Sequence, residues 1–320
     1  MQHAVESTPQ AESDIEFGGR VRDDGGASPN SSTGSPARLV VVTYNIRYAV
    51  GSFLITGSLL RRAGLSRPAR RPALVASNIR RAAATLSDGR RMPRADLVAL
   101  QEADRETVRA GRRHVARELA EELGMTYARA GVSVPAGEEQ KPKQWYLDFE
   151  ERLADADSGD TGVATLSRLP FERAGRVELP WFECAWRPRL SLYTSVPFAR
   201  GRLHLFNTHI DPHATLDEQL AQHEAVLAHA DTFPDAEPVV LLGDFNTLIS
   251  RARDATRRLL EARGYASPIP TGTGTWRAGL LRLHADWIFA RGLRFARWGV
   301  ARRAGVSDHW PVWAEVESLE

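Results

Sequence analysis

Short apolar segments that end in acids, amides or histidines recur along this chain of 320 residues, and this feature constrains the fold most. Strands are expected at 38–44, 96–100, 202–206, 239–242 and 285–289, with a final strand at 310–316. Each carries chemistry-bearing side chains at one end, or directly before it in the last case. Because a sheet delivers the side chains of its strand ends to one rim, six such ends indicate one shared polar site.

Helical segments lie between these strands, so the chain is not an all-β protein. Periodic apolar patterns predict helices over 74–86, 106–123, 216–230 and 251–263. Other strands follow one another directly, as in the expected hairpin of 190–196 with 202–207. Strands that alternate with helices but also form hairpins favour mixed sheets over a purely parallel βαβ series.

Three segments fall outside this pattern. Residues 1–37 are rich in Gly, Ser, Pro and acids and poor in apolar side chains, and they are expected to be disordered. Residues 137–160 are acidic and irregular, and we expect a surface excursion there. A long loop is expected over 47–71. A single catalytic domain is therefore expected over 38–320.

Composition and the N-terminal sequence bear on the cellular compartment of the protein. The single cysteine, Cys184, cannot form an intrachain disulfide. The N-terminal residues have neither the basic nor the apolar region of a secretory signal, and no apolar stretch approaches the roughly 18–20 residues of a membrane span. We expect a cytoplasmic monomer without stable membrane insertion.

Several catalytic classes lack their signatures in this chain. The HExxH and CxxC spacings of zinc sites are absent, as are the GxSxG turn of serine hydrolases and the GxxxxGK[ST] phosphate loop. The polar strand ends therefore favour another chemistry.

Seven motifs in order give the chain a specific resemblance. TYNIR, LQE, GVATLSR, NTHID, GDFN, DWIF and SDHWPV, spread over residues 38–318, resemble the endonuclease/exonuclease/phosphatase superfamily. The resemblance implies an α/β fold, a four-layer α/β sandwich with two facing mixed β-sheets. It also implies a divalent-metal site at one rim and metal-dependent hydrolysis of phosphate esters.

Three residues are the candidate metal ligands. Glu102 is the strongest, because Mg²⁺ prefers oxygen ligands and needs only one or two carboxylates; its alternative role is an acid at a helix N-terminus. Asn45 can offer its amide oxygen to the metal or hold Glu102, or it is a turn residue at a strand end. In the family pattern, Asp308 lies near metal and water. The expected cofactor is Mg²⁺, with Mn²⁺ as an alternative.

Asp244 and Asn246 follow a buried strand and are candidates for handling the attacking water. Asp244 can orient and deprotonate water, while Asn246 can hold the water or the phosphate in line. The alternative is an Asx-turn, which Gly243-Asp244 favours chemically.

The remaining candidates surround these carboxylates. The resemblance implies that His309 and His209 face the phosphoryl group, where a protonated imidazole can stabilise negative charge; a structural histidine is the alternative for each. Asp286 is expected to support one of them by a hydrogen bond. Asn207 is expected to orient the catalytic loop or to cap the backbone.

The substrate stays open between two classes. Arginine-rich segments at 61–94 and 251–303 suit a nucleic acid. Arg47 occupies a position where DNA-repair relatives usually carry an acid or an amide, which favours a phospholipid or small phosphoester. Arg187 and Arg189 can bind phosphate or lie on the surface.

His213 and His223 are expected to be exposed, with a position in the site as the alternative. Trp181, Trp186 and Trp276 are expected to pack against the core; stacking on bases or contact with a lipid surface are the alternatives. A non-catalytic binding module that retains the fold is the alternative function, although the acid set of Glu102, Asp244 and Asp308 is complete.

Overall fold

Two facing β-sheets form the centre of the molecule. The computed structural model describes residues 14–20, 35–51, 70–134, 137–139, 158–182, 187–302 and 305–319. The first sheet has the strand order β1 (Ile15–Gly19), β4 (Thr126–Gly131), β5 (Gly162–Ser167), β3 (Leu97–Gln101), β2 (Arg38–Asn45), β14 (Val312–Ser318) and β13 (Leu293–Val300). The second has the order β12 (Asp286–Arg291), β9 (Val239–Asp244), β8 (Gly201–His209), β7 (Leu190–Phe198) and β6 (Arg173–Glu178).

Each sheet contains one parallel pair within an antiparallel arrangement. β2 pairs with β3 and β8 pairs with β9 in parallel, whereas the other paired strands of both sheets are antiparallel. The sequence-based prediction of mixed sheets is therefore confirmed, as is the hairpin of β7 with β8.

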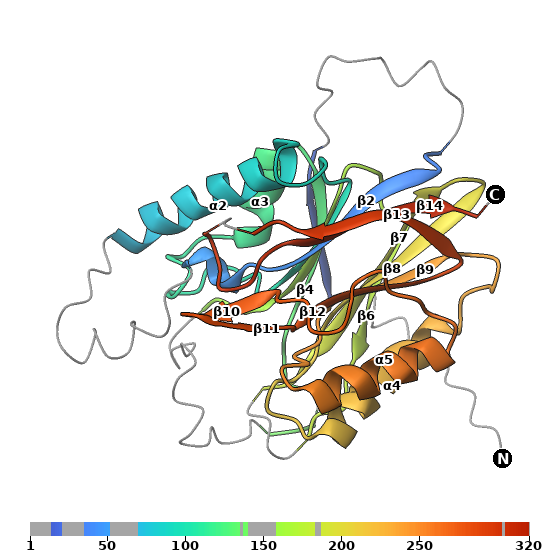
Figure 1. Ribbon diagram of the computed structural model, residues 1–320. Coiled ribbons are helices and arrows are strands. Elements are labelled where there is room, and N and C mark those ends of the chain that lie inside the picture. The colour runs from blue at the N-terminus through green and yellow to red at the C-terminus, as the bar shows by residue number, and fades with distance from the viewer. Residues whose placement is uncertain are drawn as a thin grey trace.

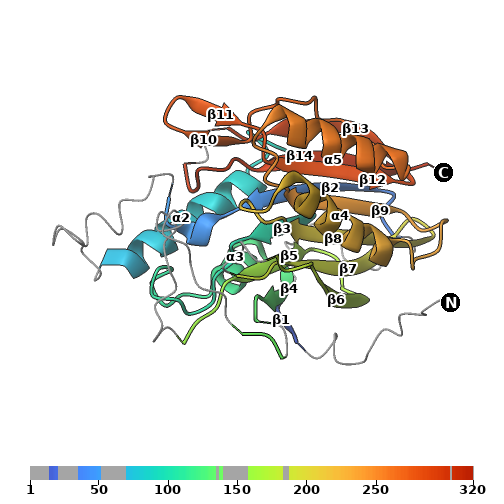
Figure 2. The same ribbon diagram turned by 90° about the horizontal axis from the view of Figure 1, so that it is seen from below.

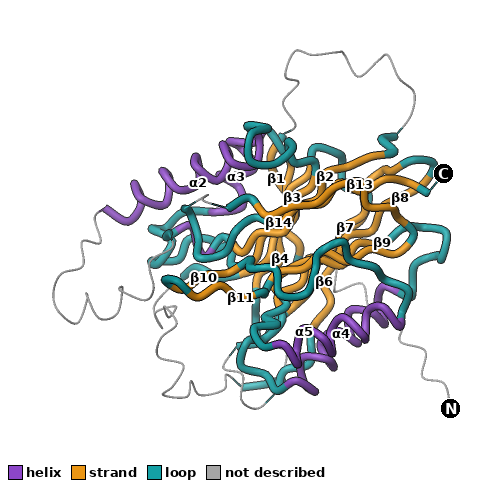
Figure 3. Tube along the Cα trace, viewed as in Figure 1, coloured by secondary structure: helices purple, strands orange, loops and turns teal. Residues whose placement is uncertain are grey.

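Helices cover the two outer faces, so the molecule has four layers. α2 (Arg71–Ser87) and α3 (Val115–Leu123) lie over the first sheet, and α4 (Leu216–Ala230) and α5 (Ser250–Ala262) over the second (Figure 1). Figure 3 shows the same separation of helices from the central strands. No described helix is long and apolar enough to cross a membrane.

A short hairpin stands apart from both sheets. β10 (Trp276–Ala278) pairs only with β11 (Leu281–Leu283) among the named strands, and the pair projects from one end of the molecule (Figures 1 and 2). The same end carries η2 (Arg47–Ala49), the 3₁₀ turn that follows β2. This is the rim at which β2, β3, β8 and β9 all terminate.

β2 shows why these residues form a central strand. Its β-branched and apolar run RLVVVTYN is buried from Leu39 onward. Leu39 and Val41 belong to the core between the sheets, whereas Val40, Val42 and Tyr44 belong to the core under α2 and α3. Because successive side chains of a strand point to opposite faces, a strand covered on both sides needs an unbroken apolar run.

One buried polar contact joins the two sheets below the rim. Asn207 of β8 donates from Nδ2 to the backbone carbonyl oxygens of Leu100 (3.0 Å) and Ala164 (2.9 Å) in the first sheet. Gln101 donates from Nε2 to Asn207 Oδ1 at 2.7 Å. Both side chains are fully buried. Asn207 thus fixes the height of β8 against β3 and β5.

The predicted helix over 106–123 is wrong in its first half. Only Val115–Leu123 is helical, with His114 accepting the Arg117 N–H at its N-cap. Glu106, Gly111 and Arg112 have positive φ angles, which a right-handed helix does not allow. Residues 106–113 instead form turns.

Part of the N-terminal segment predicted to be disordered is a strand. β1 pairs with β4 at the edge of the first sheet. Glu16 accepts hydrogen bonds from Tyr127 Oη and His114 Nε2, both at 2.8 Å, and these bonds anchor a segment that composition alone marks as polar. The predicted excursion at 137–160 lies mostly outside the described residues.

His223 is buried, so its expected exposure is wrong, whereas His213 is half-buried. The imidazole of His223 contacts the edge of Phe245 with ring centroids 4.6 Å apart. The face of α4 that carries His223 also buries Val226 and Leu227 against the second sheet. Burial lowers the pKa of His223 to about 3.

The first prediction concerns the pH dependence of stability. The unfolded chain protonates His223 near its ordinary pKa, whereas the folded chain does not, so the unfolding free energy falls as the pH drops below about 6.5, towards about 3. In a His223→Leu variant, the unfolding free energy, measured by urea titration at each pH, should change less steeply with pH. The difference in slope should reach about 1.4 kcal/mol per pH unit within this window. An unchanged slope would mean that the buried histidine is charged.

The second prediction concerns the contact between the sheets. Asn207→Ala leaves two buried carbonyl groups and the Gln101 amide without their partner, and should lower the unfolding free energy by about 3 kcal/mol or more. Asn78 is the control, because this buried amide donates one bond, to the Ala49 carbonyl oxygen. Asn78→Ala should cost about 1–2 kcal/mol. Equal losses in denaturant titrations would contradict the role assigned to Asn207.

Candidate active site

Strand register in the second sheet brings three predicted residues side by side. Asp244 ends β9 and lies opposite His209 of β8 and Asp286 of β12. Residues opposed across neighbouring strands project to the same face. Asp244 therefore has a histidine on one side and a second carboxylate on the other, all three buried.

The first sheet supplies the opposite wall. Asn45 ends β2, opposite Gln101 at the end of β3, and Glu102 follows at once. Glu102 has φ 53°, a left-handed conformation that costs free energy in a residue other than glycine. Its carbonyl oxygen accepts the N–H groups of Tyr48 and Asp104, both at 3.1 Å, which hold this turn. Because α3 begins only at Val115, Glu102 is not an acid at a helix N-terminus.

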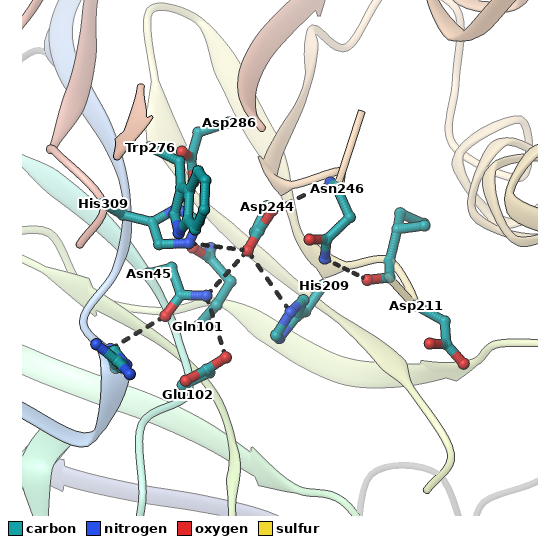
Figure 4. Close-up of polar contacts among 12 residues, drawn as sticks. Asn45, Gln101, Glu102, His209, Asp211, Asp244, Asn246, Trp276, Asp286 and His309 are labelled. Carbon is teal, nitrogen blue, oxygen red and sulfur yellow. Dashed lines mark hydrogen bonds and ion pairs between the residues drawn. The ribbon is translucent and has the colours of Figure 1, made fainter. Parts of the chain in front are cut away.

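Asp244 contacts residues from both walls of the site (Figure 4). Its Oδ2 accepts a hydrogen bond from Asn45 Nδ2 at 2.9 Å and lies 3.6 Å from Nε2 of both His209 and His309. Its Oδ1 accepts the Asn246 N–H at 3.0 Å. The two oxygens thus divide the two roles considered for Asp244: one closes an Asx-turn, and the other faces the site.

The amide of Asn45 joins the two walls. Asn45 Nδ2 also donates to Glu102 Oε1 at 3.3 Å, while Asn45 Oδ1 accepts the Arg47 N–H at 3.0 Å. Ser307 Oγ donates to the Asn45 carbonyl oxygen at 2.8 Å. Asn45 therefore orients the carboxylates of Glu102 and Asp244 towards one another.

His309 and Asp286 form a buried dyad. His309 Nδ1 lies 2.9 Å from Asp286 Oδ2, so the imidazole donates to that carboxylate. Burial alone would lower the pKa of His309, but the charges of Asp286 and Asp244 outweigh it and raise that pKa to about 10. Burial raises the pKa of Asp244 to about 6, against the lowering effect of the His309 charge. At neutral pH, His309 is therefore an imidazolium and Asp244 an ionised carboxylate.

Asp308 is adjacent to His309, but its carboxylate makes other contacts. Trp276 Nε1 donates to Asp308 Oδ2 at 3.2 Å, and Arg47 lies 3.5 Å from the same oxygen. Trp276 comes from the projecting hairpin, and Arg47 follows β2 in a turn with positive φ angles. Neither contact was predicted from the sequence, which singled out Arg47 only as a departure from the repair-enzyme pattern.

A buried arginine stands behind His209. Arg189 Nη1 lies 3.4 Å from His209 Nδ1, and both Arg187 and Arg189 are buried. These two arginines are therefore not surface residues. A guanidinium that donates to Nδ1 leaves the imidazole proton on Nε2, which faces Asp244.

The other predicted residues have supporting positions. Asn246 Nδ2 donates to the Ile210 carbonyl oxygen at 2.8 Å, which ties its loop to the end of β8. Asn207 lies below the rim in the contact between the sheets. Trp181 and Trp276 are half-buried, and Trp186 lies outside the described residues.

Two places in the site could hold a cation. At the first, Asp244, Asp286 and His309 have ligand atoms within 4.8 Å of one another, but His309 Nδ1 already donates to Asp286 Oδ2 there. The second is Glu102, whose side chain accepts a hydrogen bond from the Asn45 amide and forms no ion pair within the described part of the chain. A carboxylate of this kind fits a hard divalent cation that keeps most of its waters.

The comparisons with known proteins agree with this architecture. Residues 42–309 match the family described as the endonuclease/exonuclease/phosphatase family. No curated protein sequence matches the chain.

Solved structures of this family share the fold. An endonuclease/exonuclease/phosphatase from Beutenbergia cavernae is 19% identical with a TM-score of 0.60, over 88% of this chain and 72% of that one. The mannosyl-6-phosphatase of Bacteroides thetaiotaomicron is 18% identical with a TM-score of 0.53, over 87% and 99%. ANGEL2, a 2′,3′-cyclic phosphatase, is 16% identical with a TM-score of 0.54, over 95% and 98%. With its fold, its strand-end residues and its sequence match in agreement, the chain belongs to the endonuclease/exonuclease/phosphatase family.

Proposed function

We propose that this protein is a divalent-metal-dependent hydrolase of phosphate esters, in which Asp244 activates the attacking water. The observation that carries the proposal is the environment of Asp244 Oδ2, which faces an amide and two imidazoles from three different strand ends. Family members generally hydrolyse phosphate esters, and relatives include a mannosyl-6-phosphatase and a 2′,3′-cyclic phosphatase.

Asp244 is suited to act as the general base. Its raised pKa of about 6 leaves the carboxylate ionised at neutral pH yet more basic than an exposed aspartate. The Asx-turn through Oδ1 and the Asn45 amide hold the carboxylate in one orientation. Water that loses its proton to Asp244 Oδ2 attacks phosphorus in line with the departing ester oxygen.

The two imidazoles place N–H donors where negative charge develops on the phosphoryl oxygens. His309 is held as a cation by Asp286, and His209 has the Arg189 guanidinium behind it. Both present Nε2 towards the space around Asp244. Donors fixed in advance stabilise the charge on the phosphoryl oxygens without having to reorganise.

Glu102 would hold the divalent cation, with the side-chain oxygens of Asn45 and Asp308 as the further candidates. When bound, Mg²⁺ or Mn²⁺ supplies Lewis-acid polarisation of a phosphoryl oxygen and stabilises the leaving oxygen. The left-handed backbone of Glu102 supports this assignment, since such strain commonly persists at functional sites.

Metal dependence is the first test of this proposal. Turnover of bis(p-nitrophenyl) phosphate should disappear with EDTA and return with Mg²⁺ or Mn²⁺. Glu102→Gln removes a ligand charge and should weaken the apparent metal affinity by about tenfold or more. A wild-type metal titration in this variant would show that Glu102 is not a ligand.

Substitution of Asp244 tests the general base. Asp244→Asn keeps an acceptor for the Asx-turn but removes the basic carboxylate, so kcat should fall by about 10²–10⁴-fold. Asp231→Asn is the matched control, because Asp231 pairs with Arg263 and Arg291 on the surface, and it should keep wild-type kcat. An active Asp244→Asn enzyme would contradict the assigned role and would favour a different base.

The dyad of His309 and Asp286 should act as one unit. His309→Gln and Asp286→Asn should each lower kcat by about 10²-fold or more, and the double variant should be little worse than His309→Gln alone. Additive losses would mean that Asp286 does not act through His309.

A further inference from the structure

The β10–β11 hairpin carries an exposed apolar tip. Its two-residue turn places Gly279 at φ 59° and leaves Leu280 fully exposed. Leu281 beside it is 54% exposed. Isolated exposed leucines are common, but two adjacent ones at the end of a projecting hairpin (Figures 1 and 2) form a compact apolar point.

Three arginines surround the base of this tip. The guanidinium groups of Arg277, Arg282 and Arg302 each lie 5.7 or 5.8 Å from the ring centroid of Trp310. No acid occurs between residues 271 and 285, and none of the three arginines pairs with an acid within the described ranges. We call these three side chains and the two leucines the hairpin surface.

Several other arginines of the same half of the chain are neutralised within the protein. Arg263 pairs with Glu224, Arg291 with Asp231, and Arg297 with Glu315. A cluster of three arginines that pair with no acid among the described residues points to an anionic partner.

The hairpin surface is attached directly to the candidate active site. Trp276 donates from Nε1 to Asp308 Oδ2, and the Arg277 N–H donates to the Asp308 carbonyl oxygen at 2.9 Å. Thr275 Oγ1 accepts the Asp286 N–H at 3.0 Å. A partner seated on the hairpin surface would thus lie at the rim beside His309 and Asp286.

We propose that the hairpin surface docks the protein onto an anionic phospholipid bilayer, so that the site acts on a phosphoester in the lipid head-group layer. The substrate part of this statement rests on the proposed function, whereas the docking does not. Leucines that enter the acyl boundary beside arginines that meet phosphate head groups are the combination that a lipid surface recognises. A nucleic acid would use the arginines but would leave the two leucines in water.

The test is co-sedimentation of the full chain with vesicles in EDTA, so that binding is measured without turnover. Phosphatidylcholine vesicles with phosphatidylglycerol should bind the protein in a salt-sensitive manner, and phosphatidylcholine alone should bind it weakly. Leu280→Ser should weaken binding by about tenfold. Arg277→Gln, Arg282→Gln and Arg302→Gln should each weaken it by about fivefold. Arg297→Gln removes the same charge from a paired arginine and should have a much smaller effect.

Two results would overturn the docking proposal. The first is that the protein binds both kinds of vesicle equally, or binds neither. The other is stronger binding to duplex DNA that Leu280→Ser leaves unchanged, which would assign the arginines to a nucleic acid. Turnover of a soluble phosphodiester by the wild-type protein, measured separately, tests the proposed function, so the two failures are distinguishable.

Discussion

The contact between Asn207 and the first sheet fixes the geometry on which the active site depends. The two sheets present different catalytic groups, and a small slide between them would separate Asp244 from Asn45. Asn207 prevents this slide because its amide satisfies two carbonyl groups and the Gln101 side chain in a buried position. Buried polar groups tolerate little displacement, since each lost bond costs about 1–3 kcal/mol. The apolar core on both sides of β2 supplies stability, whereas this contact supplies alignment.

Above that contact, the site is built from strand ends in two layers. Register within the second sheet places His209, Asp244 and Asp286 in one row. The opposite side is formed by Asn45 at the end of β2, by Glu102 directly after β3, and by His309, which precedes β14. Asp244 connects the two sheets: its Oδ1 accepts the Asn246 N–H in a local turn, and its Oδ2 accepts a hydrogen bond from Asn45 of β2. The hairpin adds a third contribution by bonding to Asp308 and to the backbone of Asp286. One rim therefore combines a cluster of buried charged residues with the exposed hairpin surface.

Much of this arrangement could be predicted from the sequence. The features that could not be predicted depend on contacts between distant parts of the chain. The apolar strands and their polar ends follow from local pattern, so Asp244, His209 and Glu102 could be named. The pairing of Asp286 with His309 could be expected only in outline, because register depends on contacts far apart in the chain. The contacts of Trp276 and Arg47 with Asp308 carried no signal, since the hairpin and the left-handed turn that position them lack a distinctive pattern. The helix expected at 106–123 failed because positive φ angles at Glu106 and Arg112 depend on the surrounding fold.

The central claim is that water activated at Asp244 attacks phosphorus, and isotope labelling tests it most directly. The wild-type enzyme would hydrolyse bis(p-nitrophenyl) phosphate in ¹⁸O-labelled water with Mg²⁺ present, and the products would be examined by ³¹P NMR and mass spectrometry. We expect ¹⁸O to enter p-nitrophenyl phosphate and to be absent from p-nitrophenol. Label in the alcohol would show cleavage at carbon. Either that outcome or an absence of turnover with Mg²⁺ and Mn²⁺ would contradict the assignment of this rim as a phosphoester-hydrolysing site.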